Sequence, residues 1–564
     1  MSCNASSNAP QNDNPSLSIA FTNGNRRSAS DALSPRRNDW DVAALCLCSL
    51  ANAFVLINVF PYSGFMVLFL LPSTTPETTG TYAGFLASSF MIGRCVTAVE
   101  WGKIADRYGR VCVLQASLVL SAVFCILFGT SQSYRMALVW RFCLGAVNAI
   151  TSTTKTLASE IGHGNEEKER RAMGLVVGMR SWGFLIGPAI GGILSEPLKQ
   201  YPSIGWLQSN GWCHATLEKF PFLLPNVAVA LFCLGGAASA TWFIEETVST
   251  EDEFALRKLL RSISNALEGC WTQSTQWLPC CCGKPHTDDS TIATIRNGES
   301  QGLLSGDNST IPYGINGNES IVKSPAISTP SDQPAIWSRN STRQHLIVNW
   351  IFSFVVTFID EAFPLYCMSN VGGLGLTEAS IGKILSLAGL LFAMFQYVVY
   401  ATITDRMGLY SSIEIGCLFG LVPASLIPLS LWLSRRHSNG NGSVGDIQQQ
   451  ETHLSIVIVA FLSILLGFCK IMACMCFSSL AIATNKTVHS SQRAKMNGLS
   501  VVGASITKGA APIFGGALVS FSFSSSLVVP PEYGSIVIFS TIGILGFIVW
   551  GGTLRLERHS IEST

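Results

Sequence analysis

Two adjacent carboxylates, Asp360 and Glu361, lie inside an apolar segment that runs from Leu346 to Cys367. At 1.5 Å per helical residue Asp360 lies about 21 Å from Leu346, inside a hydrocarbon core about 30 Å thick. Ionisable groups at that depth are costly and mark ion pathways and proton relays. Because successive helical side chains point about 100° apart, we expect Glu361 to face a cavity and exchange protons, and Asp360 to pair with a neighbour. A structural ion pair for both residues is the alternative.

Cationic residues within other apolar segments form a second group of candidates. Arg141 is a functional candidate because a cation inside an apolar helix needs a cavity or a partner, and a purely structural arginine is the alternative. Arg180 and Lys508 have comparable depths in two segments and favour an anionic or zwitterionic substrate group, with snorkelling to the interface as the competing account. Asn58 is a further candidate for the substrate cavity. The other charges inside apolar segments that we noted are Arg94, Glu100 and Lys470.

The elements that must position these residues are apolar helices long enough to cross a bilayer, which takes about 20 residues. The chain is 48% hydrophobic and only 13% charged, with a mean hydropathy of +0.37. That composition excludes an ordinary soluble domain. The twelve predicted spans are Ala43–Leu71, Tyr82–Glu100, Val111–Thr130, Met136–Leu157, Met173–Leu194, Phe222–Ile244, Leu346–Cys367, Ile381–Thr402, Ile413–Leu433, Leu454–Ala483, Met496–Phe521 and Ser535–Leu554.

The polar segments divide the chain into five parts. Residues 1–40 lack the apolar core of a signal peptide and are predicted to form a disordered cytosolic tail. Residues 41–245 and 344–556 each hold six spans, separated by a polar linker at 246–343 that is predicted to be cytosolic and mostly disordered. Residues 557–564 form a C-terminal tail. Lys and Arg are enriched in the loops on the side of both termini and the linker, which assigns that side to the cytosol.

The two six-span halves repeat each other at matching points. The matching pairs are Phe60-Pro61 with Phe363-Pro364, Asp106-Arg107-Tyr108-Gly109 with Asp405-Arg406-Met407-Gly408, and Gly191-Gly192 with Gly515-Gly516. Repeats of this kind indicate two related bundles with a substrate site between them near the bilayer midplane.

The loop between the second and third spans carries a family resemblance. It reads Gly102-Lys103-Ile104-Ala105-Asp106-Arg107-Tyr108-Gly109-Arg110 and resembles the Gly-x-x-x-Asp-Arg-x-Gly-Arg loop of the major facilitator superfamily. Trp101, directly before it, points to the zinc-induced-facilitator-like branch of that superfamily's proton-coupled antiporters. The resemblance implies an all-α membrane protein with twelve transmembrane helices in two pseudo-symmetric six-helix bundles.

The same resemblance implies a conformational latch formed by this loop. Its residues would be Gly102, Asp106, Arg107, Gly109 and Arg110. Asp106 would face the N-terminus of the eleventh helix and steady the outward-facing state, since a carboxylate there gains from the helix dipole. Asp405 and Arg406 would form a weaker second copy, because Leu409-Tyr410 replaces the basic successor.

Two further patterns resemble proton-coupled exporters. The fifth span matches Gly-x-x-x-Gly-Pro-x-x-Gly-Gly at Gly183, Gly187, Pro188, Gly191 and Gly192, with small-residue packing as the alternative explanation. Arg141 begins a pattern similar to Arg-x-x-Gln-Gly, although Leu144 replaces the glutamine. In relatives this arginine is linked to proton coupling.

The linker cysteines Cys270 and Cys280–Cys282, with His286, raise the question of zinc. Their spacing does not match a closed Cys/His site, and S-acylation of the cysteine triplet is at least as good an explanation. We therefore expect no metal site and no cofactor. Because most of the cysteines that we placed lie in apolar segments, no disulfide framework is predicted either.

These patterns predict a secondary active transporter that works by alternating access. The leading hypothesis is proton-coupled antiport of a small organic solute, metal chelate or cation. A proton-coupled symporter for uptake and a non-transporting receptor or scaffold are the alternatives. No span joins a nucleophile, a base and oxyanion donors, so we expect no enzyme. The expected partners are the substrate, protons and lipid, without nucleic acid, and the chain is expected to be a monomer with cytosolic termini in a plasma or vacuolar-type membrane.

Overall fold

The computed structural model describes residues 35–161, 166–204, 211–246, 339–398, 406–438, 444–488, 493–524 and 529–556. Within these ranges the chain forms helices and no strand, and twelve helices are long and apolar enough to span a membrane. The predicted all-α fold with twelve spans is confirmed. Cys270, Cys280–Cys282, His286 and Asp405 lie outside the described residues.

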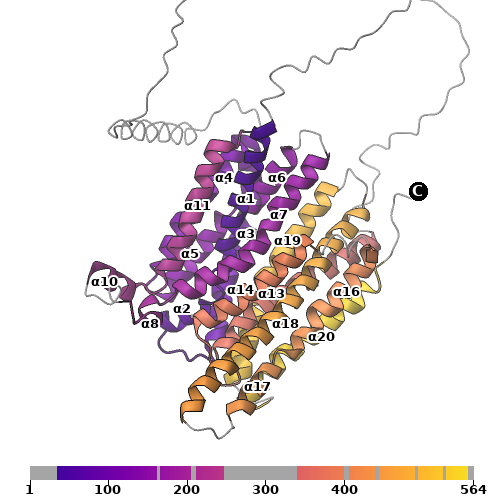
Figure 1. Cartoon of the computed structure of the whole chain (residues 1–564). Helices are drawn as coiled ribbons and strands as arrows, with labels where there is room; N and C mark the ends of the chain where they lie inside the picture. Colours follow the sequence, from indigo (N-terminus) through magenta and orange to yellow (C-terminus); the bar gives the residue numbers. More distant parts are fainter. Residues whose placement is uncertain are drawn as a thin grey trace, which may run out of the picture.

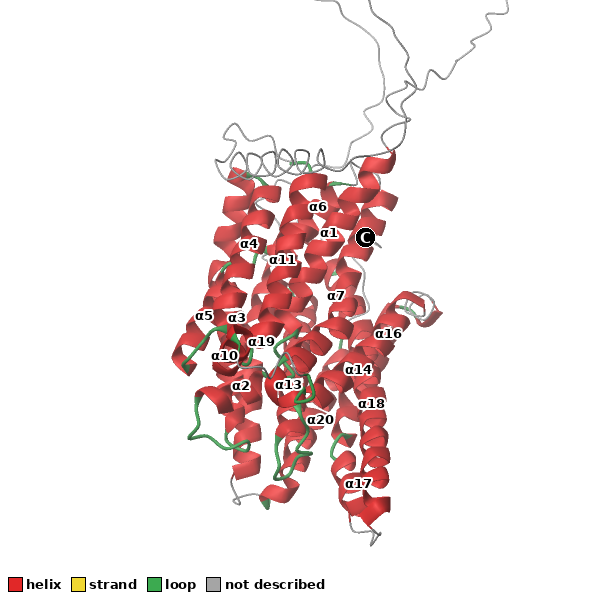
Figure 2. Ribbon diagram, turned by 60° about the vertical axis from the view of Figure 1, so that its left-hand side comes forward, coloured by secondary structure: helices red, strands yellow, loops and turns green. Residues whose placement is uncertain are grey.

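The helices form two groups that Figure 1 shows as an indigo-to-magenta bundle and an orange-to-yellow bundle. The first comprises α1 (Pro35–Ile57), α2 (Ser63–Leu70), α3 (Thr79–Tyr108), α4 (Arg110–Gly129), α5 (Tyr134–Ala146), α6 (Ile150–Glu160), α7 (Glu166–Leu194), α8 (Pro197–Gln200), α10 (Trp212–Lys219) and α11 (Leu223–Phe243). The second comprises α13 (Asn340–Met368), α14 (Glu378–Val398), α16 (Leu409–Leu421), η2 (Val422–Leu426), α17 (Leu429–Ser438), α18 (Val444–Lys486), α19 (Arg493–Ser524), η4 (Pro531–Tyr533) and α20 (Gly534–Thr553). The long helices run roughly along a common direction (Figure 2).

Two predicted spans are interrupted. The first, predicted as continuous, breaks after Ile57 into α1 and α2, and Pro61 in the break has no backbone N–H to continue the helix. The fourth divides between α5 and α6. There Ser117 Oγ donates to Val147 O at 2.6 Å and accepts from Ala149 N at 3.0 Å, so a side chain of α4 satisfies the backbone groups freed by the break.

The repeat predicted from the sequence is also visible in the backbone. Gly109 begins the α3–α4 hairpin with φ of 97°, and Gly408 precedes α16 with φ of 78°. Side chains other than glycine rarely adopt such angles, so both hairpins depend on glycine at the same position of the motif.

The bundles touch most extensively through two pairs of helices, α7 with α14 and α3 with α19. A Cβ added to Gly382 of α14 would lie 2.7 Å from Pro188 O of α7, and Gly84 of α3 faces Pro512 O of α19 even more closely. Pro188 and Pro512 occupy corresponding places in repeat-related helices. The two close crossings are therefore equivalent by pseudo-symmetry.

These crossings lie toward one end of the molecule. We call the end where α1 begins, α11 ends and α13 begins the linker end. The close contacts of Gly80 with Gly516 and of Gly192 with Gly382 lie toward the opposite end, whereas Cβ atoms at Gly102, Gly174 and Gly498 would meet nothing within 4 Å. Thus the two bundles meet most closely away from the linker end.

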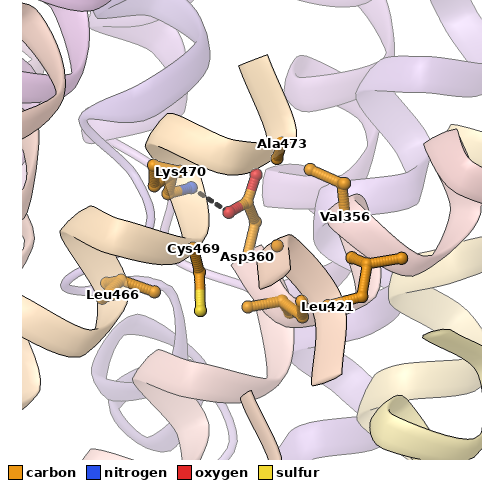
Figure 3. Close-up of a pocket in the computed structure, with 9 residues that line it drawn as sticks. Val356, Asp360, Leu421, Leu466, Cys469, Lys470 and Ala473 are labelled. Atoms are coloured by element: carbon orange, nitrogen blue, oxygen red, sulfur yellow. Dashed lines mark hydrogen bonds and ion pairs between the residues drawn. The ribbon is translucent and has the colours of Figure 1, made fainter. Parts of the chain in front are cut away.

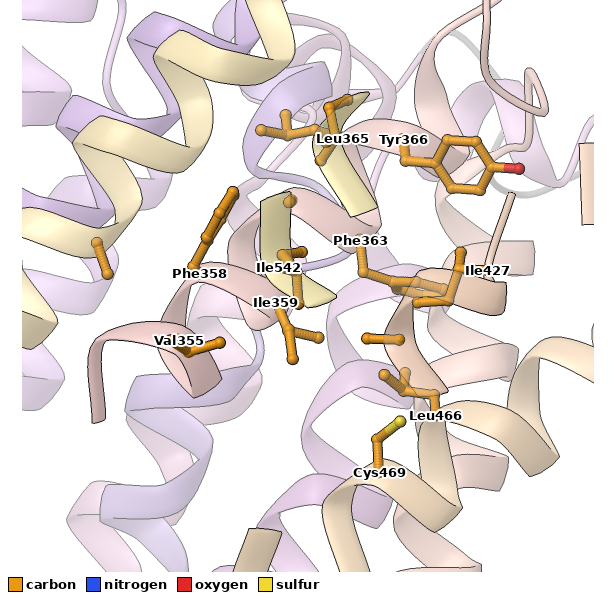
Figure 4. Packing of buried hydrophobic residues seen from close by; sticks show 14 of the residues in the cluster. Val355, Phe358, Ile359, Phe363, Leu365, Tyr366, Ile427, Leu466, Cys469 and Ile542 are labelled. Atoms are coloured by element: carbon orange, nitrogen blue, oxygen red, sulfur yellow. The ribbon is translucent and has the colours of Figure 1, made fainter. Parts of the chain in front are cut away.

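The core of the second bundle centres on α13 (Figure 4). Phe358, Phe363 and Tyr366 are almost completely buried, and the Tyr366 hydroxyl lies 2.9 Å from that of Ser430. Packing on this scale fixes the direction of each side chain on α13. It thereby determines where Asp360 and Glu361 point.

Candidate functional site

The buried carboxylate Glu361 and the buried guanidinium Arg141 come from different bundles. Their exposed fractions are 2% and 4%, and the two groups interact electrostatically although they form no ion pair within 4 Å. Within the described chain, neither carboxylate oxygen of Glu361 has a hydrogen-bond partner. Arg141 contacts the Val55 carbonyl at 3.4 Å. Opposite charges therefore lie across the boundary between the bundles.

Aromatic and amide side chains surround Arg141. Its guanidinium lies 4.9 Å from the centre of the Phe90 ring and 5.5 Å from that of Phe128. Such contacts partly compensate a cation for lost water. Tyr62, also within electrostatic range of Arg141, accepts a hydrogen bond from Asn226 Nδ2 at 3.1 Å.

Asn58 lies beside Tyr62 at the end of α1 and is 2% exposed. The sequence analysis grouped it with Arg180 and Lys508, but the structure places it in the surroundings of Arg141, because the chain leaves the helix at this point. We call Arg141, Glu361, Tyr62, Asn58 and Asn226 the paired layer. Tyr62 and Asn226 were not predicted, since neither residue type stands out in an apolar segment.

Asp360 points elsewhere. It forms an ion pair with Lys470 of α18, and each side chain is 12% exposed (Figure 3). Apolar side chains, including Leu421 and Leu466, surround the pair. Lys470 Nζ also lies 4.3 Å from the centre of the Phe184 ring of α7. The two neighbouring acids thus differ: Asp360 has an ionic partner, and Glu361 interacts with Arg141 of the other bundle.

Four cations from four helices form a second group, which we call the cationic layer. They are Arg94 of α3, Lys155 of α6, Arg180 of α7 and Lys508 of α19. Electrostatic interactions link Arg180 to each of the other three. Lys155 was missed in the sequence analysis, although a lysine inside an apolar span was the available signal.

A cavity of about 100 Å³ opens beside this layer. Lys155 and Arg180 line it together with Ser49, Asn52, Thr151 and Thr154. Asn52 is held in place because its Nδ2 donates to Thr151 Oγ1 and its Oδ1 accepts from Asn148 Nδ2, both at 2.8 Å. Ala53, Leu56, Val176 and Val177 complete the lining, so the cavity has both polar and apolar walls and is bordered by two cations.

The glycine-rich motif of α7 serves two different contacts. Gly183, Gly187 and Gly191 face α1, where a Cβ at Gly187 would lie 3.3 Å from Ile57 Cβ. Gly192 and the carbonyl of Pro188 face α14 of the other bundle. Packing against α1 explains Gly183, Gly187 and Gly191. Pro188 and Gly192 instead belong to the crossing between the bundles.

Comparison with known proteins identifies the family. A family model of the Major Facilitator Superfamily matches residues 49–444. The chain belongs to the Major Facilitator Superfamily. It is 28% identical to a probable peptide/nitrate transporter of Arabidopsis thaliana, covering 84% of this chain and 82% of the relative. It is 27% identical to the zinc induced facilitator-like 1 protein of the same plant, over 86% and 84% of the two chains.

Solved structures agree on the fold. A bacterial homologue of the human lysosomal transporter Spinster, in an inward-facing and occupied conformation, aligns with a TM-score of 0.58 and 11% identity. The alignment covers 94% of this chain and 98% of that one. The predicted membership of the superfamily, and the resemblance to its zinc-induced-facilitator-like branch, are confirmed.

The superfamily loop between α3 and α4 is not closed as a latch in this structure. The Asp106 side chain is 76% exposed, and its ionic partner among the described residues is Arg110, at 3.9 Å. Among the described residues, no hydrogen bond or ion pair joins Asp106 to α19. Arg107 lies over the Tyr108 ring at 5.2 Å, and Arg406 is exposed.

Arg110 instead belongs to a contact that the sequence analysis missed. It forms an ion pair with Glu160 of α6. Glu246, just after α11, accepts hydrogen bonds from Arg110 N at 2.7 Å and Val111 N at 2.9 Å. Glu246 thereby caps α4 with a carboxylate, which the free amide groups and the dipole at a helix N-terminus favour.

Metal-ligating side chains do not cluster in the described part of the chain, where no group of three or more His, Cys, Asp or Glu could hold an ion. The described cysteines are free thiols. The linker cysteines lie outside this part, so the expectation that they form no metal site, and the S-acylation of the triplet, stay predictions.

Proposed function

We propose that this superfamily member is a proton-coupled antiporter in which Glu361 carries the proton and Arg141 controls its release. The observation that carries the proposal is the position of two buried, oppositely charged groups on different bundles. Glu361 has no hydrogen-bond partner in the described chain, so its charged form depends on the nearby cation.

Alternating access supplies the mechanism. When the bundles rock against each other, the distance between Arg141 on α5 and Glu361 on α13 changes. Close approach of the guanidinium favours the carboxylate and expels the proton, whereas separation favours the protonated acid. Rocking about the α7–α14 and α3–α19 crossings would expose the site to one side of the membrane and then to the other.

The direction of transport and the orientation of the chain in the membrane are parts of the same proposal. Antiport is favoured by the motif at Gly183, Gly187, Pro188, Gly191 and Gly192, of which the last part lies at a crossing between bundles. The linker end is cytosolic because its loops carry the excess of Lys and Arg. The chain would then be a monomer in the plasma membrane or a vacuolar-type membrane. It would export a small organic solute, metal chelate or cation.

Reconstitution into proteoliposomes with an imposed pH gradient tests the proposal. We expect uphill accumulation of at least one probe from a panel of citrate, glycerol 3-phosphate, tetraethylammonium and Zn²⁺, and its loss on adding a protonophore. Glu361→Gln should abolish accumulation. Glu218→Gln is the control, because the Glu218 side chain lies near the end of α10 and is exposed.

An internal pH dye separates the alternatives. Protons that move opposite to the probe indicate antiport, and protons that move with it indicate the symport alternative. Accumulation that ignores the pH gradient, or that survives Glu361→Gln, would contradict the assignment of Glu361.

A further inference from the structure

The charges of the cationic layer are not balanced by protein groups. Among the described residues, Arg94, Lys155, Arg180 and Lys508 form no ion pair with a carboxylate, and none has Asp or Glu within salt-bridge distance. The carboxylate that interacts with Arg180 and Lys508 is Asp360, and Lys470 already pairs with it. Three cations therefore share Asp360, and Arg94 and Lys155 interact with no carboxylate among the described residues.

The aromatic neighbours of these cations do not remove the excess charge. The Arg180 guanidinium lies 5.4 Å from the centre of the Phe184 ring, and Lys508 Nζ lies 5.5 Å from that of Phe477. A ring face offsets part of the lost hydration but carries no net charge. Because Lys155 and Arg180 are exposed beside the cavity, an anionic solute can reach them and supply the counter-charge.

The geometry of the cavity limits what that solute presents to the protein. Its volume of about 100 Å³ corresponds to roughly three waters at about 30 Å³ each. One carboxylate or phosphate group fits there, between Lys155 and Arg180. Ser49 Oγ and Thr154 Oγ1 donate to backbone carbonyls, so the two cations are the main free donors for an anion.

A second anionic group would lie toward the other bundle. Lys508 on α19 and Arg94 on α3 both interact with Arg180, and their helices form one of the two crossings between bundles. A solute with two negative groups would thus contact both bundles. Its binding would lower the repulsion among cations that alternate access brings together.

We propose that the cationic layer binds a small organic solute with at least two negatively charged groups, with Arg180 as the residue common to both subsites. The inference rests on the proposed transport function and narrows its substrate. It excludes a bare metal cation or an organic cation as the solute bound here, whereas an anionic metal chelate stays compatible.

Binding to the purified full-length protein tests this inference without a gradient, so that it is independent of proton coupling. The binding of each probe is measured by calorimetry. The probes are citrate for carboxylates, glycerol 3-phosphate for phosphates, and tetraethylammonium and Zn²⁺ for cations. We expect at least one of the two anions to bind, and its binding to weaken as salt is raised.

Variants assign the binding to the cationic layer. Arg180→Gln should raise the Kd of the bound anion at least about tenfold, and Lys508→Gln should raise it less. Arg180→Lys, which keeps the charge, should retain more of the affinity than Arg180→Gln. Lys199→Gln is the matched control, because the Lys199 side chain lies in the short helix α8 and is 76% exposed, and it should leave the Kd within about twofold.

Several results would overturn the inference. These are failure of both anions to bind, anion affinity that is unchanged in correctly folded Arg180→Gln protein, or binding of a cation probe that Arg180→Gln strengthens. Failure of proton-driven transport with intact anion binding would instead contradict only the proposed function. Proton-driven transport of a cation would contradict only this inference.

Discussion

The paired layer and the cationic layer both lie on membrane-spanning helices, yet Arg141 and Glu361 of the paired layer are buried, whereas Lys155 and Arg180 of the cationic layer are exposed. In the paired layer one carboxylate and one guanidinium, 2% and 4% exposed, face each other across the two bundles. In the cationic layer two of the four like charges, Lys155 and Arg180, border an open cavity. A carboxylate paired with a guanidinium can retain or release a proton without a bound solute. A group of like charges needs an anionic solute to balance its charge.

The two layers meet on α13, where Asp360 and Glu361 are consecutive. Asp360 pairs with Lys470 and interacts with Arg180 of the cationic layer, while Glu361 interacts with Arg141. One turn of α13 therefore interacts with charged groups of both layers. A change in the charge of either layer acts on the same rigid, tightly packed helix, which offers a physical route for coupling.

The largest effect should come from separating Asp360 from Lys470. Asp360→Asn leaves a buried lysine without its partner, so we expect a destabilisation of about 3–5 kcal/mol. The double variant Asp360→Asn with Lys470→Met should recover most of the loss, because it removes both charges. Thermal unfolding in detergent measures both. A single variant as stable as the double would show that the pair is not a structural link between the layers.

Much of this arrangement was predictable from the sequence, and the reason differs between residues. Apolar length determined the twelve spans, and rare charges inside them identified Arg141, Glu361, Arg180 and Lys508. That Arg141 faces Glu361 could not be predicted, because the pairing depends on how two bundles dock. Periodicity within one helix carries no information about the other.

The breaks in two spans had weaker signals. Pro61 was visible, but the interruption at Val147 depends on Ser117, a distant residue that satisfies the freed backbone groups. The position of Asn58 beside Tyr62 follows from the break after α1, so it could not be predicted either. The latch was predicted from a family resemblance that describes another conformational state.

Arg141→Met should separate the two layers by function. Methionine keeps much of the length and packing but leaves Glu361 without a counter-charge, so we expect uphill transport to fall at least about tenfold. Binding of an anion in the cationic layer should stay within about twofold. Flux assays and calorimetry on the same preparation check this, and equal losses in both would mean that the layers are not distinct.

A smaller effect is expected where the bundles cross. Pro188→Ala restores a backbone hydrogen bond to α7 and straightens it, so the protein should be expressed normally but leak protons or lose uphill accumulation. Gly187→Leu, which faces Ile57 of α1, is the steric control and should impair packing by about 1–3 kcal/mol. Wild-type proton coupling in Pro188→Ala, together with impaired packing in Gly187→Leu, would show that the motif serves packing alone.

The smallest effect is expected at the loop between α3 and α4. Asp106 is largely exposed here, so Asp106→Asn should change the stability of this conformation by less than about 1 kcal/mol. It should still shift the population further toward the state that is open at the linker end, because the latch closes only in the opposite state. Labelling of cavity cysteines from each side measures the shift, and an unchanged labelling pattern would argue against a latch.

The most direct test of the account compares two activities of Glu361→Gln in the same proteoliposomes. Glutamine cannot carry the proton but has nearly the same size, so the variant should lose proton-driven accumulation. It should still exchange substrate across the membrane at close to the wild-type rate when no gradient is imposed. Retained accumulation, or loss of exchange and accumulation together in a correctly folded protein, would contradict the claim that the paired layer couples protons to transport.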